Sequence, residues 1–133
     1  MPAPRPLITE LARPFWNALR AHRVMLQQCD RCSHWIFYPR PMCPLCGARE
    51  LSWRDVPPGA RLYSYTITDV PVSRDFADIP RQILAIVELS VGVRVPSTLV
   101  NVAPERVQIG AELEPVFDDT TFPDLTVLRF APC

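Results

Sequence analysis

The stretch Cys29-Asp30-Arg31-Cys32, followed after ten residues by Cys43-Pro44-Leu45-Cys46-Gly47, decides how this chain folds. In each C-x-x-C pair one tight turn presents two thiolates to the same point, and two such turns supply the four sulfur ligands of a closed tetrahedral zinc site. Because four protein ligands leave no open position for water or substrate, we expect one structural zinc. Its predicted ligands are Cys29, Cys32, Cys43 and Cys46.

Two alternatives to a zinc site remain open from the sequence. The cysteines could pair as disulfides or lie reduced in a core, although their spacing matches known zinc ribbons much more closely. Iron is the rival metal, because a Cys-Pro-x-Cys-Gly turn also occurs in rubredoxin-like sites and sulfur ligands alone do not separate iron from zinc.

The short, proline-closed segment at residues 33–42 predicts a hairpin folded back between the two cysteine turns. Residues 24–56 then form a zinc ribbon, with strands at residues 24–28 and 51–56 as its outer edges. Gly47 suits the positive φ needed where the chain leaves the second turn, and Ser33 holds the corresponding place after the first. A ribbon of this size is too small to fold on its core alone, so the metal must stabilise it.

The segment Pro57-Pro58-Gly59 marks a domain boundary, and a barrel domain is predicted at residues 60–133. Alternation of Tyr63, Tyr65 and Ile67 with polar residues indicates a strand with one buried face, and Pro96 indicates an edge or a bulge. A small closed barrel is the economical way to cover five strands, and the OB-fold is the common five-stranded barrel. Runs rich in β-branched residues, tyrosine and leucine predict these strands at residues 61–70, 82–90, 93–102, 112–118 and 125–130, with a mobile loop at 71–81.

Residues 1–23 predict an extended arm and a short helix. Three prolines within the first seven residues prevent a regular helix there, whereas Pro14 suits the first turn of a helix at residues 14–22. Phe15, Trp16 and Leu19 place three large apolar groups within little more than one turn. So short a helix is not stable alone, and its apolar face must pack against the ribbon, the barrel or another chain.

The formal net charge is zero, but the charges are unevenly placed. Residues 1–61 hold nine arginines against four acidic residues, whereas residues 62–133 hold five arginines against ten. The simpler explanation of this uneven charge is that arginine–carboxylate pairs form between the halves. The more specific alternative is that the ribbon arginines face an anionic ligand or an acidic partner. The acidic barrel half has the wrong sign for binding nucleic acid.

No apolar run approaches the roughly 18 residues of a membrane span, and the N-terminus lacks the pattern of a secretory signal. We therefore expect a cytoplasmic protein that does not bind a membrane. Reduced thiols in that compartment favour metal binding, and the fifth cysteine, Cys133, is expected to be a bystander.

The sequence offers few candidates for catalysis. Neither His22 nor His34 has a serine or cysteine nucleophile at a recognisable motif spacing. Asp118 and Asp119 are adjacent, so on a strand they point to opposite faces and are more simply part of a turn. We therefore expect no catalytic residue in this chain.

The order of these motifs resembles a family of small proteins that join an N-terminal helix and a rubredoxin-like zinc ribbon to a C-terminal OB-fold. The resemblance extends from about residue 8 to residue 131. The stretches that carry it are Phe15-Trp16, Gln28-Cys29-x-x-Cys32, Tyr38-Pro39-Arg40, Cys43-Pro44-x-Cys46-Gly47, Tyr63-Ser64-Tyr65-Thr66, residues 85–89, Gly92-Val93-Arg94 and Ile109-Gly110.

This resemblance implies a non-catalytic partner subunit of an acyl-CoA enzyme. The partner would be a thiolase-superfamily acyltransferase or a steroid side-chain aldolase, or alternatively a MaoC-like enoyl-CoA hydratase. Acyl-CoA would bind at or near the interface, with Arg40 close to the CoA phosphates. The aromatic stem of Phe15, Trp16 and Leu19 predicts the partner contact. A nucleic-acid-binding OB module is the alternative of another class.

Overall fold

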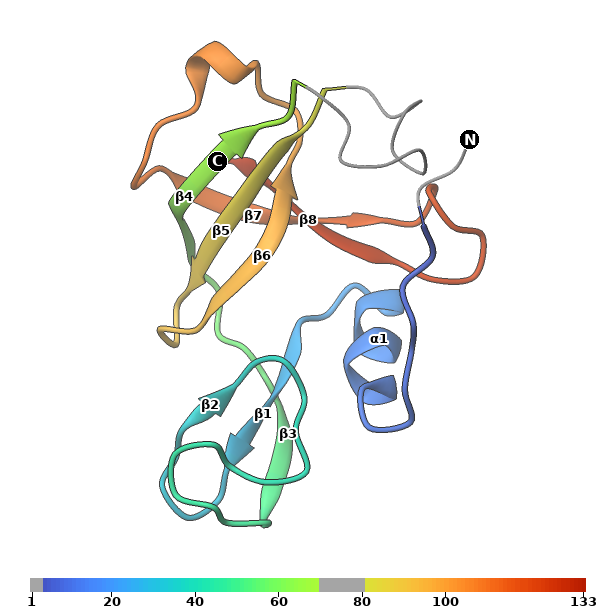
Figure 1. Ribbon diagram of the computed structural model, residues 1–133, viewed down its shortest axis with the longest axis vertical. Helices are drawn as coiled ribbons and strands as arrows, with labels where there is room; N and C mark the ends of the chain where they lie inside the picture. The colour runs from blue at the N-terminus through green and yellow to red at the C-terminus, as the bar shows by residue number, and fades with distance from the viewer. Residues whose placement is uncertain (1–3, 70–80) are drawn as a thin grey trace.

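A computed structural model describes residues 4–69 and 81–133, and Figure 1 shows its elements. The loop expected to be mobile at residues 71–81 lies outside the described residues, except for Arg81. The mainly β fold with one short N-terminal helix is confirmed. The elements are α1 (Arg13–Arg20), β1 (Met25–Cys29), β2 (Trp35–Ile36), β3 (Leu51–Asp55), β4 (Ala60–Ile67), β5 (Ile83–Leu89), β6 (Arg94–Leu99), η2 (Pro104–Arg106), β7 (Glu112–Asp118) and β8 (Val127–Pro132).

The helix α1 has a proline in its first turn and ends in a left-handed cap. Pro14 lies in its first turn, as predicted. At its C-terminus the His22 N–H donates to the Leu19 carbonyl and the Arg23 N–H to the Ala18 carbonyl, while His22 has a φ of 60°. These are the two bonds of a Schellman motif, with histidine at the position usually held by glycine. The helix therefore ends at Arg20, two residues before the predicted end. No helix in the described ranges is long and apolar enough to cross a membrane.

The ribbon sheet has β1 at its centre. Its strand order is β2-β1-β3, with both pairs antiparallel, so that Gln27 lies opposite Ile36 on one side and Trp53 on the other. The prediction that the first ribbon strand forms an outer edge was wrong. Two residues of the hairpin between the cysteine pairs fold back onto β1 and occupy its second side.

The five C-terminal strands close into a mixed barrel in the order β4-β5-β6-β8-β7, with β7 returning to β4 (Figure 1). Neighbouring strands are antiparallel except β6 and β8, which pair in parallel at Leu99 and Phe130. The connection through η2 carries the chain from β6 to β7, so that β8 can return between them. The predicted five-stranded barrel is confirmed.

A β-bulge in β4 changes which tyrosine faces the core. The register between β4 and β5 shifts between Leu62 and Ser64, so Tyr63 is the extra residue. Leu62 is 1% exposed and Tyr63 is 47% exposed, whereas Tyr65 and Ile67 pack against the core. The alternation of Tyr63, Tyr65 and Ile67 therefore does not mark one face, because the bulge interrupts the two-residue period.

Pro96 lies in β6 without costing a hydrogen bond to β5. The Leu89 N–H donates to the Val93 carbonyl, and alternate antiparallel pairs share this bonded geometry. Pro96 faces Ile86 in the intervening non-bonded position, so its nitrogen points away from β5. On its other side β6 pairs with β8 at Leu99, and the part of the strand before Leu99, which includes Pro96, is an open edge, as the proline predicted.

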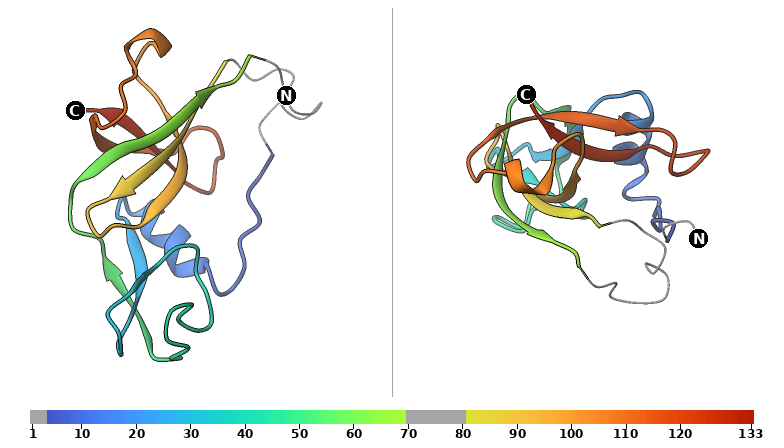
Figure 2. Two further views of the ribbon diagram at one scale, coloured as in Figure 1. Left: turned by 60° about the vertical axis from the view of Figure 1, so that its left-hand side comes forward. Right: turned by 90° about the horizontal axis from the view of Figure 1, so that it is seen from above.

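One hydrophobic core joins the helix, the ribbon and the barrel. Phe15 and Leu19 of α1 and Leu26 of β1 are buried against barrel residues such as Leu62 and Phe130. Figure 2 shows α1 beside the ribbon strands, with the loop between β7 and β8 reaching toward it. A separate small cluster lies under the cysteine turns and consists of Cys29, Ile36, Cys43 and Ala48.

Ion pairs connect the basic N-terminal half to the acidic C-terminal half. Nη1 of Arg5 lies 2.6 Å from Oδ1 of Asp124, and Nη1 of Arg20 lies 3.7 Å from Oδ1 of Asp119. Nε2 of His22 lies 2.7 Å from Oδ2 of Asp119. The prediction of arginine–carboxylate pairs between the halves is confirmed, and the pairs with Asp119 hold the end of α1 to the β7–β8 loop.

Candidate metal centre and docking groove

The four cysteines lie on two equivalent turns. The Ser33 N–H donates to the Cys29 carbonyl and the Gly47 N–H to the Cys43 carbonyl, each at 2.9 Å. Ser33 and Gly47 both have positive φ, at 65° and 78°. The local structure that the sequence predicted for each C-x-x-C pair is therefore present, although serine takes the strained position in the first turn.

The sulfur atoms have the spacing of a tetrahedral metal site. The Sγ atoms of Cys29 and Cys46, and those of Cys32 and Cys43, are 3.6 Å apart, and all four lie within 4.8 Å of one another. Four sulfurs at zinc–sulfur bonds of 2.3 Å form a tetrahedron with edges of about 3.8 Å. Since a disulfide requires about 2.05 Å, the cysteines are not paired as disulfides.

Backbone amides favour the thiolate form of the buried cysteines. The Cys32 N–H points to Sγ of Cys29 at 3.5 Å and the Leu45 N–H to Sγ of Cys43 at 3.4 Å. The amide of Cys32 lowers the pKa of Cys29. Burial acts to raise the pKa of Cys43, but the amides of Cys46 and Leu45 and the neighbouring thiols lower it to about 7. Thiolates are the form that binds metal, and four cysteine sulfurs at this spacing fit a tetrahedral zinc or iron ion.

The loop between the cysteine turns is fixed from inside by Gln27, which the sequence did not single out. Gln27 is 4% exposed, and its side chain donates to the Arg40 carbonyl at 3.0 Å and accepts from the Arg40 N–H at 2.8 Å. A carboxamide satisfies both backbone groups at once. A polar residue within the strand predicted at residues 24–28 was the only sequence signal for this role.

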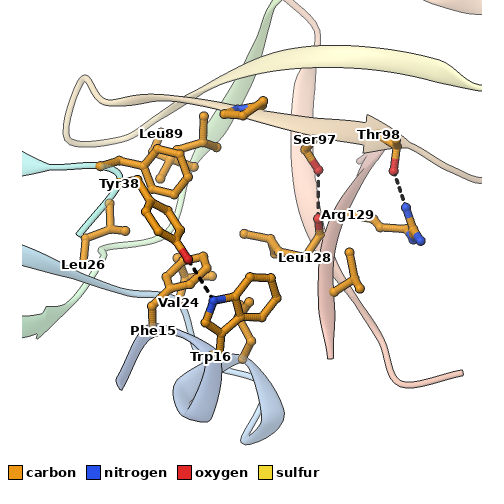
Figure 3. A pocket seen from close by; sticks show the side chains of 15 residues that line it. Phe15, Trp16, Val24, Leu26, Tyr38, Leu89, Ser97, Thr98, Leu128 and Arg129 are labelled. Carbon is orange, nitrogen blue, oxygen red and sulfur yellow. Dashed lines mark hydrogen bonds between the residues drawn. The ribbon is translucent and has the colours of Figure 1, made fainter. Parts of the chain in front are cut away.

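An apolar groove of about 220 Å³ lies between α1, the ribbon loop and the barrel (Figure 3). Trp16 and Tyr38 form part of its wall, and Nε1 of Trp16 donates to the Tyr38 hydroxyl at 3.0 Å. Phe15 packs edge-on against Trp16 at 5.4 Å and against Tyr38 at 6.0 Å between ring centroids. This hydrogen bond and these ring contacts couple the helix to the ribbon loop.

The opposite wall of the groove is the open edge between β6 and β8. Here side chains replace backbone pairing: the Ser97 hydroxyl donates to the Leu128 carbonyl at 2.9 Å, and Nη1 of Arg129 donates to the Thr98 hydroxyl at 2.6 Å (Figure 3). Nε of Arg129 donates to Asp118 at 2.8 Å. Asp118, the last residue of β7, therefore binds the Arg129 side chain of β8, whereas the adjacent Asp119 lies toward α1.

The three residues predicted to contact a partner have different surroundings. Phe15 and Leu19 are buried within the chain, at 6% and 1% exposure, because the barrel and ribbon already cover that side of the helix. Trp16 is half-buried, and the neighbouring Tyr38 is 39% exposed. Of the three predicted residues only Trp16 thus reaches the groove surface, where Tyr38 of the ribbon loop lies beside it.

Arg40 is exposed beside a second cavity, between the ribbon loop and the β5–β6 turn. The two histidines lie apart: His34 lines this cavity, whereas His22 stacks on Phe117 at 4.9 Å between ring centroids and bonds to Asp119. Within residues 4–69 and 81–133, no serine, threonine or cysteine side chain hydrogen-bonds to either imidazole.

Two family models match consecutive parts of the chain. Residues 16–52 match the ChsH2 rubredoxin-like zinc ribbon domain, and residues 53–118 match the ChsH2 C-terminal OB-fold domain. The junction between the two matches falls within β3, so the OB-fold match also includes the end of this ribbon strand.

Relatives from three organisms illustrate the similarity. A DUF35 domain-containing scaffold protein of Methanothermobacter thermautotrophicus is 31% identical over 84% of each chain, and one of Pyrococcus furiosus is 31% identical over 77% of this chain and 74% of the relative. A probable enoyl-CoA hydratase alpha subunit of Thermomonospora curvata is 31% identical over 97% of this chain, which spans only 40% of that relative's length.

Solved structures agree with these matches. A chain of an Ltp2-ChsH2(DUF35) aldolase superposes with a TM-score of 0.85 at 28% identity, covering 96% of this chain and 98% of that one. A DUF35 protein of unknown function from Sulfolobus solfataricus, at 16% identity, shares the fold with a TM-score of 0.65 over 91% of this chain and 84% of that one. The chain therefore belongs to the ChsH2/DUF35 family, whose members join a rubredoxin-like zinc ribbon to a C-terminal OB-fold.

Proposed function

We propose that this chain is a non-catalytic partner subunit of an acyl-CoA-processing enzyme. The partner is a thiolase-superfamily acyltransferase or a steroid side-chain aldolase, and the chain stabilises the complex and helps to shape its CoA-thioester site. The observation that carries this proposal is the likeness, over 96% of the chain, to a protein described as part of an Ltp2-ChsH2(DUF35) aldolase. Relatives called scaffold proteins support a role through binding rather than through chemistry.

The docking surface that we propose is the apolar groove, with Trp16 and Tyr38 as its contact residues. Large aromatic side chains that are partly exposed and rigidly held are the usual anchors of protein interfaces. Phe15 and Leu19 support this surface from below through their packing. Arg40, on the ribbon loop next to Tyr38, would then lie near the CoA phosphates at the interface.

We further propose that the metal is one structural zinc. The four-thiolate donor set leaves no open coordination position, so the metal would hold the ribbon loop in place rather than activate a substrate. Iron in the same site would give the same sulfur spacing and would be recognised by its visible absorption, whereas zinc is colourless.

The docking proposal is tested with a Trp16→Ala, Tyr38→Ala double variant, because both side chains are partly exposed and the fully buried Phe15 and Leu19 are kept. We expect the variant to keep its metal and fold but to separate from the thiolase-like partner in size-exclusion chromatography, with loss of the activity of the complex. The matched control is Ile109→Ala, since Ile109 is 61% exposed on the barrel. Co-elution of the double variant at full activity would place the interface elsewhere.

A hydratase partner is the second candidate, because one relative is named a probable enoyl-CoA hydratase alpha subunit. The two are separated by assaying the purified complex for thiolysis of a 3-oxoacyl-CoA and retro-aldol cleavage of a 3-hydroxyacyl-CoA against hydration of an enoyl-CoA. In either case the chain alone should turn over none of these substrates. Salt-dependent binding of single-stranded nucleic acid by the isolated chain would instead favour the OB-module alternative.

A further inference from the structure

The cavity beside Arg40 gathers cationic side chains from parts of the chain that are far apart in sequence. It measures about 250 Å³ and lies between the ribbon loop and the β5–β6 turn. Arg40 and His34 line it from the ribbon and Arg94 from the first position of β6, while Trp35 and Phe37 supply aromatic walls. Phe37 lies between this cavity and the proposed docking groove and lines both.

Arg94 is held ready to bind an anion. Its guanidinium carbon lies 3.7 Å from the centroid of the Tyr63 ring, and its Nε donates to Glu88 at 3.1 Å. The bulge in β4 places Tyr63 outside the barrel, where this stacking is possible. Among the described residues the Nη groups of Arg94 make no hydrogen bond, so the edge of the guanidinium remains available although Glu88 occupies Nε.

Arg40 is held by its backbone and not by a counter-ion. Both of its main-chain polar groups bond to the buried Gln27 side chain. Its side chain is exposed and forms no ion pair within residues 4–69 and 81–133. The backbone of Arg40 is therefore held in place, and its guanidinium group has no counter-ion among the described residues.

We propose that this cavity binds a phosphate group of an organic phosphate, with Arg40 and Arg94 as its two ligands. A carboxylate is saturated by one bidentate arginine, whereas a phosphate carries enough oxygens to engage two guanidinium groups at once. The cavity is smaller than the 300–1,000 Å³ typical of sites for whole ligands, so it takes the charged end of a larger molecule.

This inference deepens the proposed function by giving the phosphates of a CoA thioester a defined subsite, and in that respect rests on it. The binding itself does not require a partner and is measured on the isolated chain. If the isolated chain did not bind phosphate, the proposed docking of a partner could still be correct. If the partner did not dock, phosphate binding could still occur, so the two failures are distinguishable.

The test is a titration of the metal-loaded full chain with phenyl phosphate at low ionic strength, followed by NMR, with benzoate as the carboxylate of similar shape. We expect saturable shifts at Arg40, Arg94 and the Trp35 indole for phenyl phosphate and much weaker ones for benzoate. Arg40→Ala and Arg94→Ala should each weaken binding about tenfold, the loss expected for one charge-assisted hydrogen bond. Arg106→Ala, which removes an exposed arginine from η2, should leave it unchanged.

Arg94→Lys serves as a second variant, since it keeps the charge but loses the planar fork stacked on Tyr63. It should bind phenyl phosphate more weakly than the wild type while retaining the fold. The inference is overturned if no saturable binding occurs, if benzoate binds as well as phenyl phosphate, or if Arg106→Ala weakens binding as much as the cavity variants do.

Discussion

The ribbon and the barrel bury very different amounts of apolar side chain. Among the described residues, the cluster beneath the cysteine turns contains four buried residues, two of which are cysteines, whereas the main core contains twelve. The inner end of the ribbon belongs to that main core through Leu26, while its cysteine end does not. The comparison indicates that one end of a single small sheet is held by the hydrophobic effect, whereas the other end has little apolar burial and carries the four cysteines of the proposed metal site.

Removing a metal ligand should have the largest effect and should separate the cysteine end of the ribbon from the barrel most clearly. Structural zinc sites contribute apparent binding free energies of about 10–16 kcal/mol, and the small cysteine cluster has little else to replace them. In Cys43→Ser we expect loss of zinc and fast hydrogen exchange at the amides of Ser33 and Gly47. The barrel amide of Val87 should stay protected. Elemental analysis and exchange monitored by NMR measure both effects.

The matched control for this prediction is Cys133→Ser, because Cys133 is an exposed cysteine outside the metal cluster. It should keep one zinc and wild-type exchange throughout. An unchanged zinc content in Cys43→Ser, or loss of barrel protection together with that of the ribbon, would contradict the division between the two regions.

Much of this division could be predicted from the sequence. The spacing of the cysteine pairs specified the two turns, and β-branched runs specified the five barrel strands, because both signals are local. The central position of β1 was missed because β2 is only two residues long and has no pattern of its own. The outward position of Tyr63 was missed because a bulge leaves no mark in the alternation of residue types.

The second prediction concerns the helix, which belongs to the barrel's core although it precedes the ribbon in sequence. Leu19 is 1% exposed, so Leu19→Ala should lower the free energy of unfolding by about 2–5 kcal/mol. Leu11, just before α1, is 41% exposed, so Leu11→Ala should change the free energy of unfolding by less than about 0.5 kcal/mol. Urea unfolding measures both. If Leu19→Ala kept full stability but lost the partner, Leu19 would be a contact residue, as the sequence suggested.

The candidate site shows why the sequence could predict only part of it. Phe15, Trp16 and Leu19 were identified as one apolar stripe, but only the tertiary arrangement decides which member reaches the surface. Tyr38 meets Trp16, and Arg40 meets Gln27, through contacts across 22 and 13 residues. Such pairs have no periodic signal, so sequence reasoning assigned a role to Arg40 without the residue that positions it.

The third prediction tests the barrel at the point where side chains replace backbone pairing. Burial acts to raise the pKa of Asp118, but hydrogen bonds from Thr121 and Arg129 hold it well below its usual range. Asp118→Asn should cost about 1.5–3 kcal/mol at neutral pH, because the bonds to a charged acceptor are lost. Asp55→Asn, at an exposed pair with Arg23, should cost much less.

The difference in unfolding free energy between the wild type and Asp118→Asn should depend on pH in a defined direction. A carboxyl group whose pKa is lower in the folded state stabilises the fold fully above its unfolded pKa. The difference between wild type and Asp118→Asn should therefore be constant at pH 5 to 8 and shrink below about pH 4, where the unfolded chain takes up the proton. Urea unfolding at several pH values measures it. A difference that grew on acidification would contradict this assignment.

The smallest effect is expected where the two regions meet at the surface. Asp119 accepts hydrogen bonds from Thr126 and His22, which lower its pKa, and it joins the end of α1 to the β7–β8 loop. Because the pair with His22 is exposed, salt should screen it. A double-mutant cycle with Asp119→Asn and His22→Ala should give a small coupling at low ionic strength that disappears in 1 M salt. A coupling that survived high salt would mean that the hydrogen bond between His22 and Asp119, which salt does not screen, carries the link between helix and barrel rather than their charges.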